Sequence, residues 1–244
     1  MALILREVHT LYGTSRLGYL WAVIQTMFGI GIFWGIREIA GAHAPHGMSI
    51  LMFLLAGFGV WYVFSDTLSK CLTAVSGNKA LLTFPQVTPL DLMLSRAVVV
   101  WGTQVFSGGV IVGISAFCGF PPFISNWTGF FFVVLAAPLL GLGCGMLCSS
   151  LAVFWPTLEK IVPMILRILF FASGIFFSVS MFPKSVADIL LLNPVMHLIE
   201  LLRQSLSRGY ADPTYSYFYM LSFCVVVLCL GGLLERYARK RAEQ

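Results

Sequence analysis

The sequence predicts an all-α polytopic membrane protein with six transmembrane helices, in one domain that covers residues 1–244. Of the 244 residues 59% are hydrophobic and only 10% are charged, which leaves too little polar surface to cover a soluble domain. Residues 97–158 carry no Asp, Glu, Lys or Arg, and this stretch is long enough for two spans of ~20 residues each. Further hydrophobic stretches on both sides of it supply the other four spans.

Residues 1–16 predict a short helix that lies in the membrane interface and ends at Gly13. Apolar residues fall on one side of it and polar residues on the other, a pattern typical of interfacial helices. We find no long apolar core followed by a small-residue cleavage site, so we expect no removable signal peptide. The apolar side comprises Ile4, Val8, Leu11 and Tyr12, and the polar side comprises Arg6, His9 and Thr10.

The first two spans are expected over residues 17–36 and 48–64. The loop between them contains His43 and His46, but without a nearby cysteine or carboxylate cluster we expect no metal site there. From residue 65 the chain becomes more polar, and residues 65–96 are expected to form a cytoplasmic loop with its own amphipathic helix. The apolar stripe of this loop helix comprises Leu68, Cys71, Leu72 and Val75.

The third and fourth spans are expected on either side of a turn at residues 119–127. The fourth span has a small-residue face that favours close helix packing, and the fifth and sixth spans are expected over residues 161–181 and 218–234. Six spans place both termini on one side of the membrane. The small-residue face comprises Gly141, Gly143, Gly145 and Ser149.

Residues 183–209 predict short helices that do not span the membrane. Asn193 is a good N-cap, Pro194 suits the first helical position, and Gly209 suits the end of the helix. At ~1.5 Å per residue the helix between Asn193 and Gly209 is roughly 20 Å long, short of the ~30 Å hydrocarbon core. We expect its apolar face to pack on the spans, while an ion pair on its polar face meets water. The apolar face comprises Val195, Leu198, Ile199, Leu202 and Leu206, and the polar face comprises Glu200, Arg203, Gln204 and Ser207.

The distribution of Lys and Arg orients the chain. With the termini inside, ten of the fifteen basic residues lie on the cytoplasmic side and four on the other, while Arg167 lies within the fifth span. We therefore expect cytoplasmic termini and a position on the other side of the membrane for the helix Pro194–Arg208. This excess of cytoplasmic basic residues also explains the formal charge of +5, so we expect no nucleic-acid partner and expect the basic tail to meet membrane lipid.

The sequence supplies no nucleotide site of its own. It contains no G-x-x-x-x-G-K-[ST] motif, and its glycines lie in apolar spans rather than after a strand. If transport uses a nucleotide, a second polypeptide must bind it, so we expect no cofactor on this chain. An amphipathic helix in residues 65–96 offers its apolar face to such a partner or to lipid, and composition alone leaves both open.

Three segments carry a resemblance to a known family: REVHTLYGTSRLGYLWAVIQ at the start, NKALLTFPQVTPLDLMLSRA in the loop and NPVMHLIELLRQSLSRGY near the end. With these motifs in the same order and spacing, the whole chain resembles the permease subunits of ABC-2-type exporters. The FPQV-x-PLD form resembles the branch that exports capsular polysaccharide in Gram-negative bacteria.

The resemblance implies a homodimer of permeases in the bacterial inner membrane, with two ATPase subunits that carry ATP and Mg²⁺. It implies a lipid-linked acidic polysaccharide as cargo, re-entrant gate helices at the periplasmic mouth, and periplasmic and outer-membrane export components as further partners. An ABC-2 permease for O-antigen or teichoic acid is the alternative within the superfamily.

A long acidic sugar chain favours a path with aromatic faces for stacking and a few cations. We expect the path to be lined by Arg167, Phe170, Phe171, Trp21, Phe28 and Trp34, and the gate to include Asn193, Pro194, Glu200 and Arg203. We expect the ATPase to contact Leu68, Leu72, Val75, Phe84, Pro85 and Gln86.

Two other classes fit less well. An intramembrane transferase acting on lipid-linked sugars needs clustered acids, a His/Asp pair or a metal site, and the four histidines and ten acids here are scattered. A secondary transporter working alone usually shows repeated halves with ionisable residues at the midplane, and the uncharged stretch of residues 97–158 has no counterpart elsewhere in the chain.

Overall fold

The computed structural model describes residues 3–4, 6–7, 18–41, 47–78, 81–82, 86–117, 119, 123–207, 210 and 215–242. Regular structure among these residues is helical, with no strand. The expected all-α fold is therefore confirmed for the described part of the chain. The long helices are α2 (Gly18–Ile39), α3 (Ile50–Leu72), α4 (Pro89–Phe117), α5 (Trp127–Phe154), α6 (Leu158–Ala172) and α9 (Tyr217–Ala242), and the short elements are η2 (Ser76–Asn78), η3 (Val179–Met181), α7 (Lys184–Leu190) and α8 (Pro194–Ser205).

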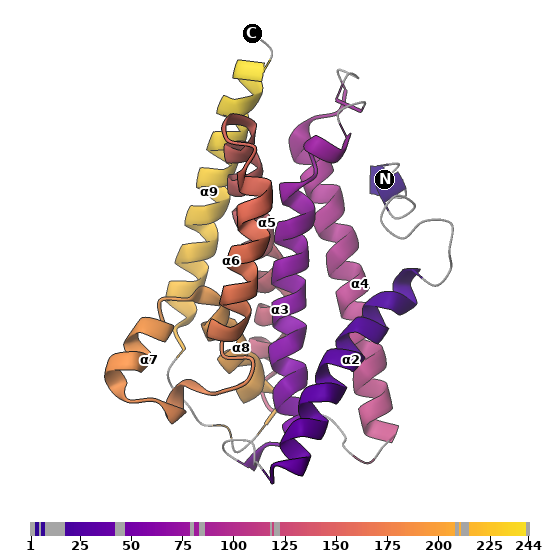
Figure 1. The fold of residues 1–244 in the computed structure, drawn as a ribbon, viewed down its shortest axis with the longest axis vertical. Coiled ribbons are helices and arrows are strands. Elements are labelled where there is room, and N and C mark those ends of the chain that lie inside the picture. The colour runs from indigo at the N-terminus through magenta and orange to yellow at the C-terminus, as the bar shows by residue number, and fades with distance from the viewer. Residues whose placement is uncertain are drawn as a thin grey trace.

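The long helices form a bundle in which consecutive helices run in opposite directions (Figure 1). The described N-terminal residues, η2 and the C-terminal end of α9 lie at one end of this bundle, at the top of Figure 1. The short helices α7 and α8 lie at the opposite end of the bundle.

Four described helices are long and apolar enough to cross a membrane: α3, α4, α5 and the part of α9 over Tyr217–Arg241. Helices α7 and α8, bent by 104° at the break between them, bring the number to five only if they count as one span. The side chains of residues 18–22 in α2 lie outside the described part of the chain. With 15 residues α6 is ~22 Å long, less than the hydrocarbon core. By length and composition the described residues thus show four or five candidate spans, and they do not confirm the expected six.

The boundary expected at residue 65 does not occur, because α3 continues without a break to Leu72. The polar residues that suggested the boundary are accommodated inside the helix. Thr67 Oγ1 donates to the Val63 carbonyl oxygen at 2.6 Å, and Asp66 Oδ2 accepts a hydrogen bond from Gln104 Nε2 of α4 at 2.8 Å. The change in composition therefore marks polar contacts along a continuous helix.

The small-residue face expected on the fourth span is confirmed as a packing surface. A Cβ added at Gly141 would lie 2.7 Å from the Phe64 carbonyl oxygen, and one at Gly145 would lie 2.5 Å from Cys71 Cβ. On the other side of α5, a Cβ at Gly143 would lie 3.0 Å from the backbone nitrogen of Leu228. The backbone of α5 thus approaches both α3 and α9 at distances that only glycine permits.

Candidate functional site

The fifth expected span, residues 161–181, is interrupted where α6 ends at Ala172. Gly174 has a φ of +76°, which favours glycine, and a Cβ at this position would overlap Met196 Sδ of α8. After this turn the chain forms a loop and then η3 (Val179–Met181). The expectation of one continuous span is wrong here, because the backbone reverses at a left-handed glycine.

Helix α8 begins as its sequence predicts. Asn193 Oδ1 accepts a hydrogen bond from the Val195 backbone nitrogen at 3.0 Å, and Pro194 is the first helical residue. The amide nitrogen of the same side chain, Asn193 Nδ2, donates to Ser173 Oγ at 2.9 Å. The N-cap therefore also ties the start of α8 to the residue that ends α6, while the expected end at Gly209 lies outside the described residues.

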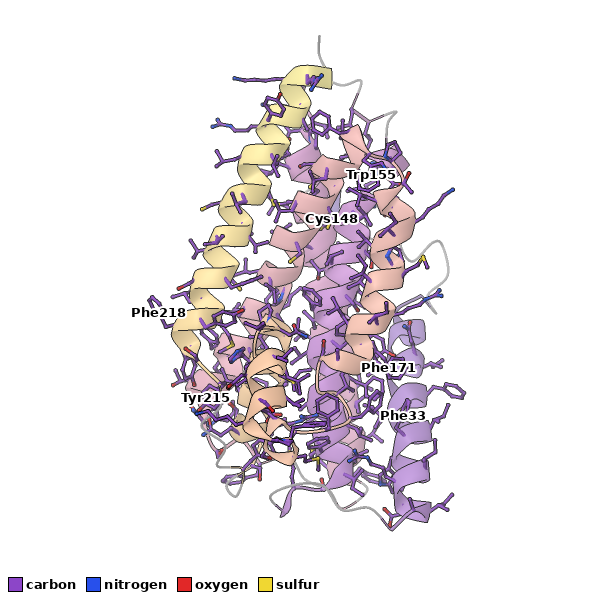
Figure 2. All side chains as sticks on the ribbon, turned by 60° about the vertical axis from the view of Figure 1, so that its left-hand side comes forward. Phe33, Cys148, Trp155, Phe171, Tyr215 and Phe218 are labelled. Carbon is purple, nitrogen blue, oxygen red and sulfur yellow. The ribbon has the colours of Figure 1, made fainter. Side chains whose placement is uncertain are left out.

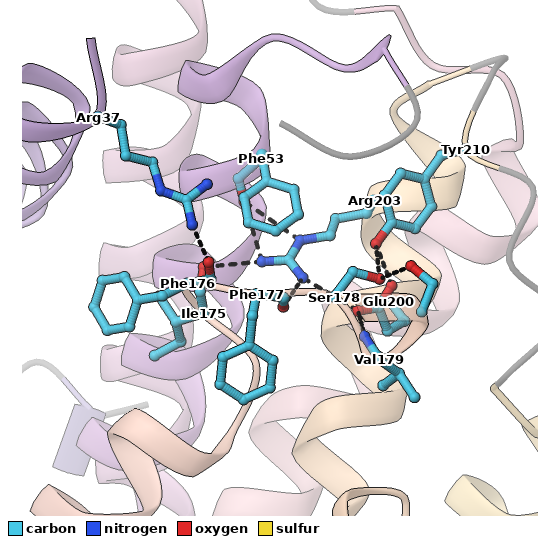
Figure 3. Close-up of polar contacts among 11 residues, drawn as sticks. Arg37, Phe53, Ile175, Phe176, Phe177, Ser178, Val179, Glu200, Arg203 and Tyr210 are labelled. Carbon is cyan, nitrogen blue, oxygen red and sulfur yellow. Dashed lines mark hydrogen bonds and ion pairs between the residues drawn. The ribbon is translucent and has the colours of Figure 1, made fainter. Parts of the chain in front are cut away.

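Arg203 of α8 is completely buried and holds the loop that follows α6 (Figure 3). Its Nη1 donates to the Phe177 carbonyl oxygen at 3.0 Å, and its Nη2 donates to the Ile175 carbonyl oxygen at 2.9 Å. Nε donates to the Phe53 carbonyl oxygen of α3 at 3.4 Å, and the guanidinium lies 3.5 Å from the centroid of the Phe53 ring. One guanidinium thus joins α8, α3 and the loop.

Glu200, one turn earlier in α8, is also completely buried. Its Oε1 accepts hydrogen bonds from Arg203 Nη1 at 3.3 Å and from the Val179 backbone nitrogen at 3.4 Å, and its Oε2 accepts one from the Tyr210 hydroxyl. The Tyr210 hydroxyl also lies 2.8 Å from Ser178 Oγ. Burial, and then the nearby carboxylate, raise the pKa of Tyr210, so the phenol remains protonated and able to donate.

A second arginine reaches the same loop from α2. Arg37 Nη2 donates to the Phe176 carbonyl oxygen, and the guanidinium lies 5.5 Å from the centroid of the Phe53 ring (Figure 3). The ring of Phe33, one turn earlier in α2, lies 4.3 Å from that of Phe176. We call the side chains of Arg37, Glu200, Arg203 and Tyr210, with residues 175–179 of the loop, the arginine network.

The prediction that Glu200 and Arg203 form an exposed pair on a wet face is wrong. Residues 175–179 fold over the polar face of α8, and the carbonyl groups of that loop satisfy the guanidinium in place of water. The predicted apolar face is confirmed, because all five of its residues are buried. Gln204 remains half-buried and accepts a hydrogen bond from the Tyr215 hydroxyl.

An open groove of about 490 Å³ lies between α2, α3 and α6. Arg167, which is exposed, lines it from α6 together with two phenylalanines, and Asp66 lines it from α3. Phe171 also lies against Phe176, 6.0 Å between ring centroids, on the side where α6 approaches α2 (Figure 2). The lining consists of Gln25 of α2, Trp61, Ser65, Asp66 and Ser69 of α3, and Pro163, Leu166, Arg167, Phe170 and Phe171 of α6.

This groove places hydroxyl, amide, carboxylate and guanidinium groups beside aromatic rings. The Phe170 ring packs 5.7 Å from that of Trp61 and 5.1 Å from that of Phe171, between ring centroids. Such a surface can stack on the apolar faces of sugar rings, hydrogen-bond their hydroxyl groups and attract anionic groups. Chemically it suits a flexible, polar and negatively charged chain better than a compact apolar ligand.

The structure brings some of the predicted path residues together and leaves others apart. Arg167, Phe170 and Phe171 share the groove. Phe28 and Trp34 lie outside its lining on α2, with 68% and 39% of their surfaces exposed, and the side chain of Trp21 lies outside the described part. Sequence reasoning overlooked the polar wall from α3. The available signal was Asp66, an acid inside an apolar helix and four residues before Lys70.

A family model described as ABC-2 type transporter matches residues 1–207 of the chain. The protein belongs to this family. It is 29% identical over 235 residues to the polysialic acid transport protein KpsM of Escherichia coli, covering 96% of this chain and 91% of KpsM. It is 24% identical over 235 residues to the capsule polysaccharide export inner-membrane protein CtrC of Neisseria meningitidis, covering 95% of this chain and 87% of CtrC. It is 22% identical over 230 residues to the O-antigen export system permease protein RfbA of Klebsiella pneumoniae, covering 93% and 86%.

In this ABC-2 protein the apolar stripe predicted to contact an ATPase is only partly available. Leu68 and Leu72 lie inside α3 with 5% and 2% of their surfaces exposed, so they pack within the chain. Val75 is half-buried and Gln86 is exposed, while Phe84 and Pro85 lie outside the described residues. The stripe is covered because Gly145 of α5 lets α3 pack closely at this level.

A buried ion pair that sequence reasoning overlooked joins the N-terminal segment of the ABC-2 protein to α4. Arg96 Nε lies 3.1 Å from Glu7 Oε2, and Arg96 Nη1 donates to the Lys70 carbonyl oxygen at 2.9 Å. This guanidinium therefore connects the start of the chain, the end of α3 and α4. Within the described part of the chain, no three or more His, Cys, Asp or Glu residues gather as a metal would require, and His43 and His46 lie outside that part.

Proposed function

We propose that this chain is the transmembrane permease subunit of an ATP-binding cassette exporter that moves lipid-linked acidic capsular polysaccharide across the bacterial inner membrane. The observation that carries this proposal is similarity over nearly the whole chain to KpsM and CtrC, whose names state polysialic acid transport and capsule polysaccharide export. The polar and aromatic groove between α2, α3 and α6 supports it from the chemistry of the chain itself.

The groove serves as part of the translocation path in this proposal. Arg167 attracts carboxylate or phosphate groups of the cargo, while Phe170, Phe171 and Trp61 offer faces to the sugar rings. Ser65, Ser69 and Gln25 exchange hydrogen bonds with sugar hydroxyls. Because Arg167 is exposed at the edge of this groove, it can bind and release a moving anion without leaving a buried charge unpaired.

Helices α7 and α8 form the gate at the periplasmic end, with Asn193, Pro194, Glu200 and Arg203 as its structural residues. Their position opposite both termini supports this assignment (Figure 1). The arginine network holds the loop between α6 and the gate, so a displacement of α6 is passed directly to α8. Glu200 and Arg203 therefore position the gate and do not contact the cargo.

ATP and Mg²⁺ are bound by a separate ATPase subunit, and this chain binds no cofactor. Membership of the ABC-2 transporter family supports such a partner, and the permease acts as a homodimer with periplasmic and outer-membrane export components beyond it. The end of the bundle that carries both termini faces the cytoplasm, because most Lys and Arg residues lie there. There Gln86 and Val75 remain available to the ATPase.

Deletion and complementation test the proposal in the organism that encodes the chain. Deletion should remove capsule from the cell surface and cause lipid-linked polysaccharide to accumulate inside the cell, and the wild-type gene should restore export. An ATPase encoded nearby should co-purify with the tagged permease. A deletion strain with a normal capsule and unchanged glycan pools would show that the proposal is wrong.

The same experiment decides the alternative cargo. Similarity to RfbA of Klebsiella pneumoniae, at 22% identity, supports O-antigen as the second candidate. Accumulation of O-antigen with capsule unaffected would establish that assignment instead.

A further inference from the structure

A second groove, of about 590 Å³, lies between the start of α4 and the C-terminal part of α9 and shares no lining residue with the groove of the proposed path. Its lining divides into an apolar part and a charged part. The apolar part includes Leu90, Leu228 and Leu233, and the charged part consists of Glu235, Arg236 and Arg239. The groove thus crosses the boundary between the apolar segment of α9 and its charged end.

One face of α9 supplies the groove with residues of graded polarity. Leu228, Gly232, Glu235 and Arg239 recur at helical spacing, so they lie along a single stripe. A Cβ added at Gly232 would meet only Met146 Cε, at 3.9 Å, whereas one at Gly231 would lie 2.9 Å from Met146 Cβ. Packing therefore requires glycine at position 231 but not at 232, where the missing side chain widens the groove.

Glu235 is a buried carboxylate with one oxygen that has no hydrogen-bond partner among the described residues. Only 5% of its surface is exposed, and its Oε1 accepts no hydrogen bond in the described part of the chain. Arg236 and Arg239 attract it electrostatically, while Asp91 of α4 repels it. The Asp91 carboxylate is engaged at one oxygen, because its Oδ2 accepts hydrogen bonds from the backbone nitrogen and the hydroxyl of Thr88.

We propose that this groove binds a phospholipid whose headgroup carries a primary ammonium group. The phosphate lies near Arg236 and Arg239, and the ammonium donates to Glu235, since a buried carboxylate is best satisfied by a charged donor. One acyl chain lies along Leu228 and the gap at Gly232. Two arginines and two carboxylates balance locally, which favours a zwitterionic headgroup over an anionic one.

Native mass spectrometry of the purified full-length chain tests the proposal with three lipids of identical acyl chains. Phosphatidylethanolamine should be retained about tenfold more than phosphatidylcholine, a ratio equivalent to ~1.4 kcal/mol. The comparison is sharp because methylation removes the N–H donors and leaves the charge and the phosphate. Phosphatidylglycerol, which is anionic, should be retained less than phosphatidylethanolamine.

Three variants separate the contributions. Glu235→Gln should lower the ratio of phosphatidylethanolamine to phosphatidylcholine to about one without abolishing lipid retention, since the arginines that bind phosphate remain. Arg236→Ala with Arg239→Ala should lower retention of all three lipids, and Gly232→Leu should do so by filling the gap. Glu159→Gln, an acid-to-amide change at the same end of the bundle, serves as the matched control and should leave every ratio unchanged.

Two results with the wild-type chain would overturn the proposal. One is equal retention of the ethanolamine and choline lipids, and the other is stronger retention of phosphatidylglycerol. So would a Glu235→Gln variant that keeps the wild-type preference. Gel filtration before each measurement identifies variants that fail to fold, and Gly232→Leu then tests the site independently of Glu235.

Discussion

Arg167 of α6 and Arg203 of α8 lie on either side of the loop that follows α6, with η3 and α7 also between them, yet their surroundings differ completely. Arg203 is fully buried, with its guanidinium bonded to backbone carbonyls, to Glu200 and against the Phe53 ring. Arg167 is exposed at the edge of an open groove. A guanidinium whose N–H groups are all hydrogen-bonded within the protein stabilises the fold. A guanidinium that is open to solvent can bind a ligand. The two arginines thus separate the fixed connection to α8 from the surface proposed to carry cargo.

The comparison predicts its largest effect at Arg203. Arg203→Ala removes the guanidinium from a buried carboxylate and three carbonyl groups, and breaking a buried pair in this way costs about 3 to 5 kcal/mol. We expect a strong loss of folded protein in membranes, measured by immunoblotting and by thermal unfolding of the purified chain. Normal abundance and an unchanged unfolding temperature would contradict the role assigned to this network.

A smaller loss of stability is expected for Glu200→Gln, which keeps the shape but removes the charge. The amide retains an acceptor for the Tyr210 hydroxyl, while the ion pair with Arg203 is lost, so we expect about 1 to 3 kcal/mol. A pair exposed to water, as the sequence predicts, would contribute little to stability, but Glu200 and Arg203 are both buried. Tyr210→Phe is the matched comparison, because it removes only the hydroxyl group, and its unfolding temperature should fall less.

Arg37→Gln should have an intermediate effect. Arg37 is only half-buried and makes one hydrogen bond to the loop, to the Phe176 carbonyl oxygen, so we expect a loss of about 1 kcal/mol. Limited proteolysis of the loop at residues 173–179 should become faster while the bundle remains folded. Unchanged cleavage there would show that α2 does not restrain the loop.

The smallest effect on stability, and a large one on transport, is expected at Arg167. Arg167→Ala should leave the unfolding temperature unchanged, because an exposed charge contributes ~0 to 1 kcal/mol. Export should fall, with wild type above Arg167→Lys and Arg167→Ala lowest, measured as surface polysaccharide at equal permease abundance. Lys160→Ala, at an exposed lysine of the same helix, should export normally. Normal export by Arg167→Ala would remove this residue from the path.

The sequence predicts the local features of α8 well, because they depend on neighbouring residues. Asn193 caps α8, Pro194 opens it, and the apolar face is buried as the spacing indicates. Burial of Glu200 and Arg203 was not predictable in this way. The groups that cover them come from residues 175–179 and Tyr210, and a helical pattern carries no information about what packs on its polar face.

The same distinction explains the groove and the helix boundaries. Arg167, Phe170 and Phe171 were identified because they lie on one helix, whereas Asp66 and Gln25 join them only through the packing of three helices. The break after Ala172 depends on the backbone angle at Gly174, and many membrane helices contain glycine without breaking. The boundary at residue 65 failed because contacts with Gln104 satisfy Asp66 inside a continuous helix.

The glycines of α5 have a consequence for how the protein can move. The backbone of α5 lies very close to α3 on one side and to α9 on the other. Sliding of one of these three helices along another would therefore make backbone atoms collide. Helix α6 has only two buried residues, Val162 and Leu166, so it is packed less tightly than these three helices. The contrast between these three closely packed helices and the less buried α6 makes α6 the helix expected to move most easily.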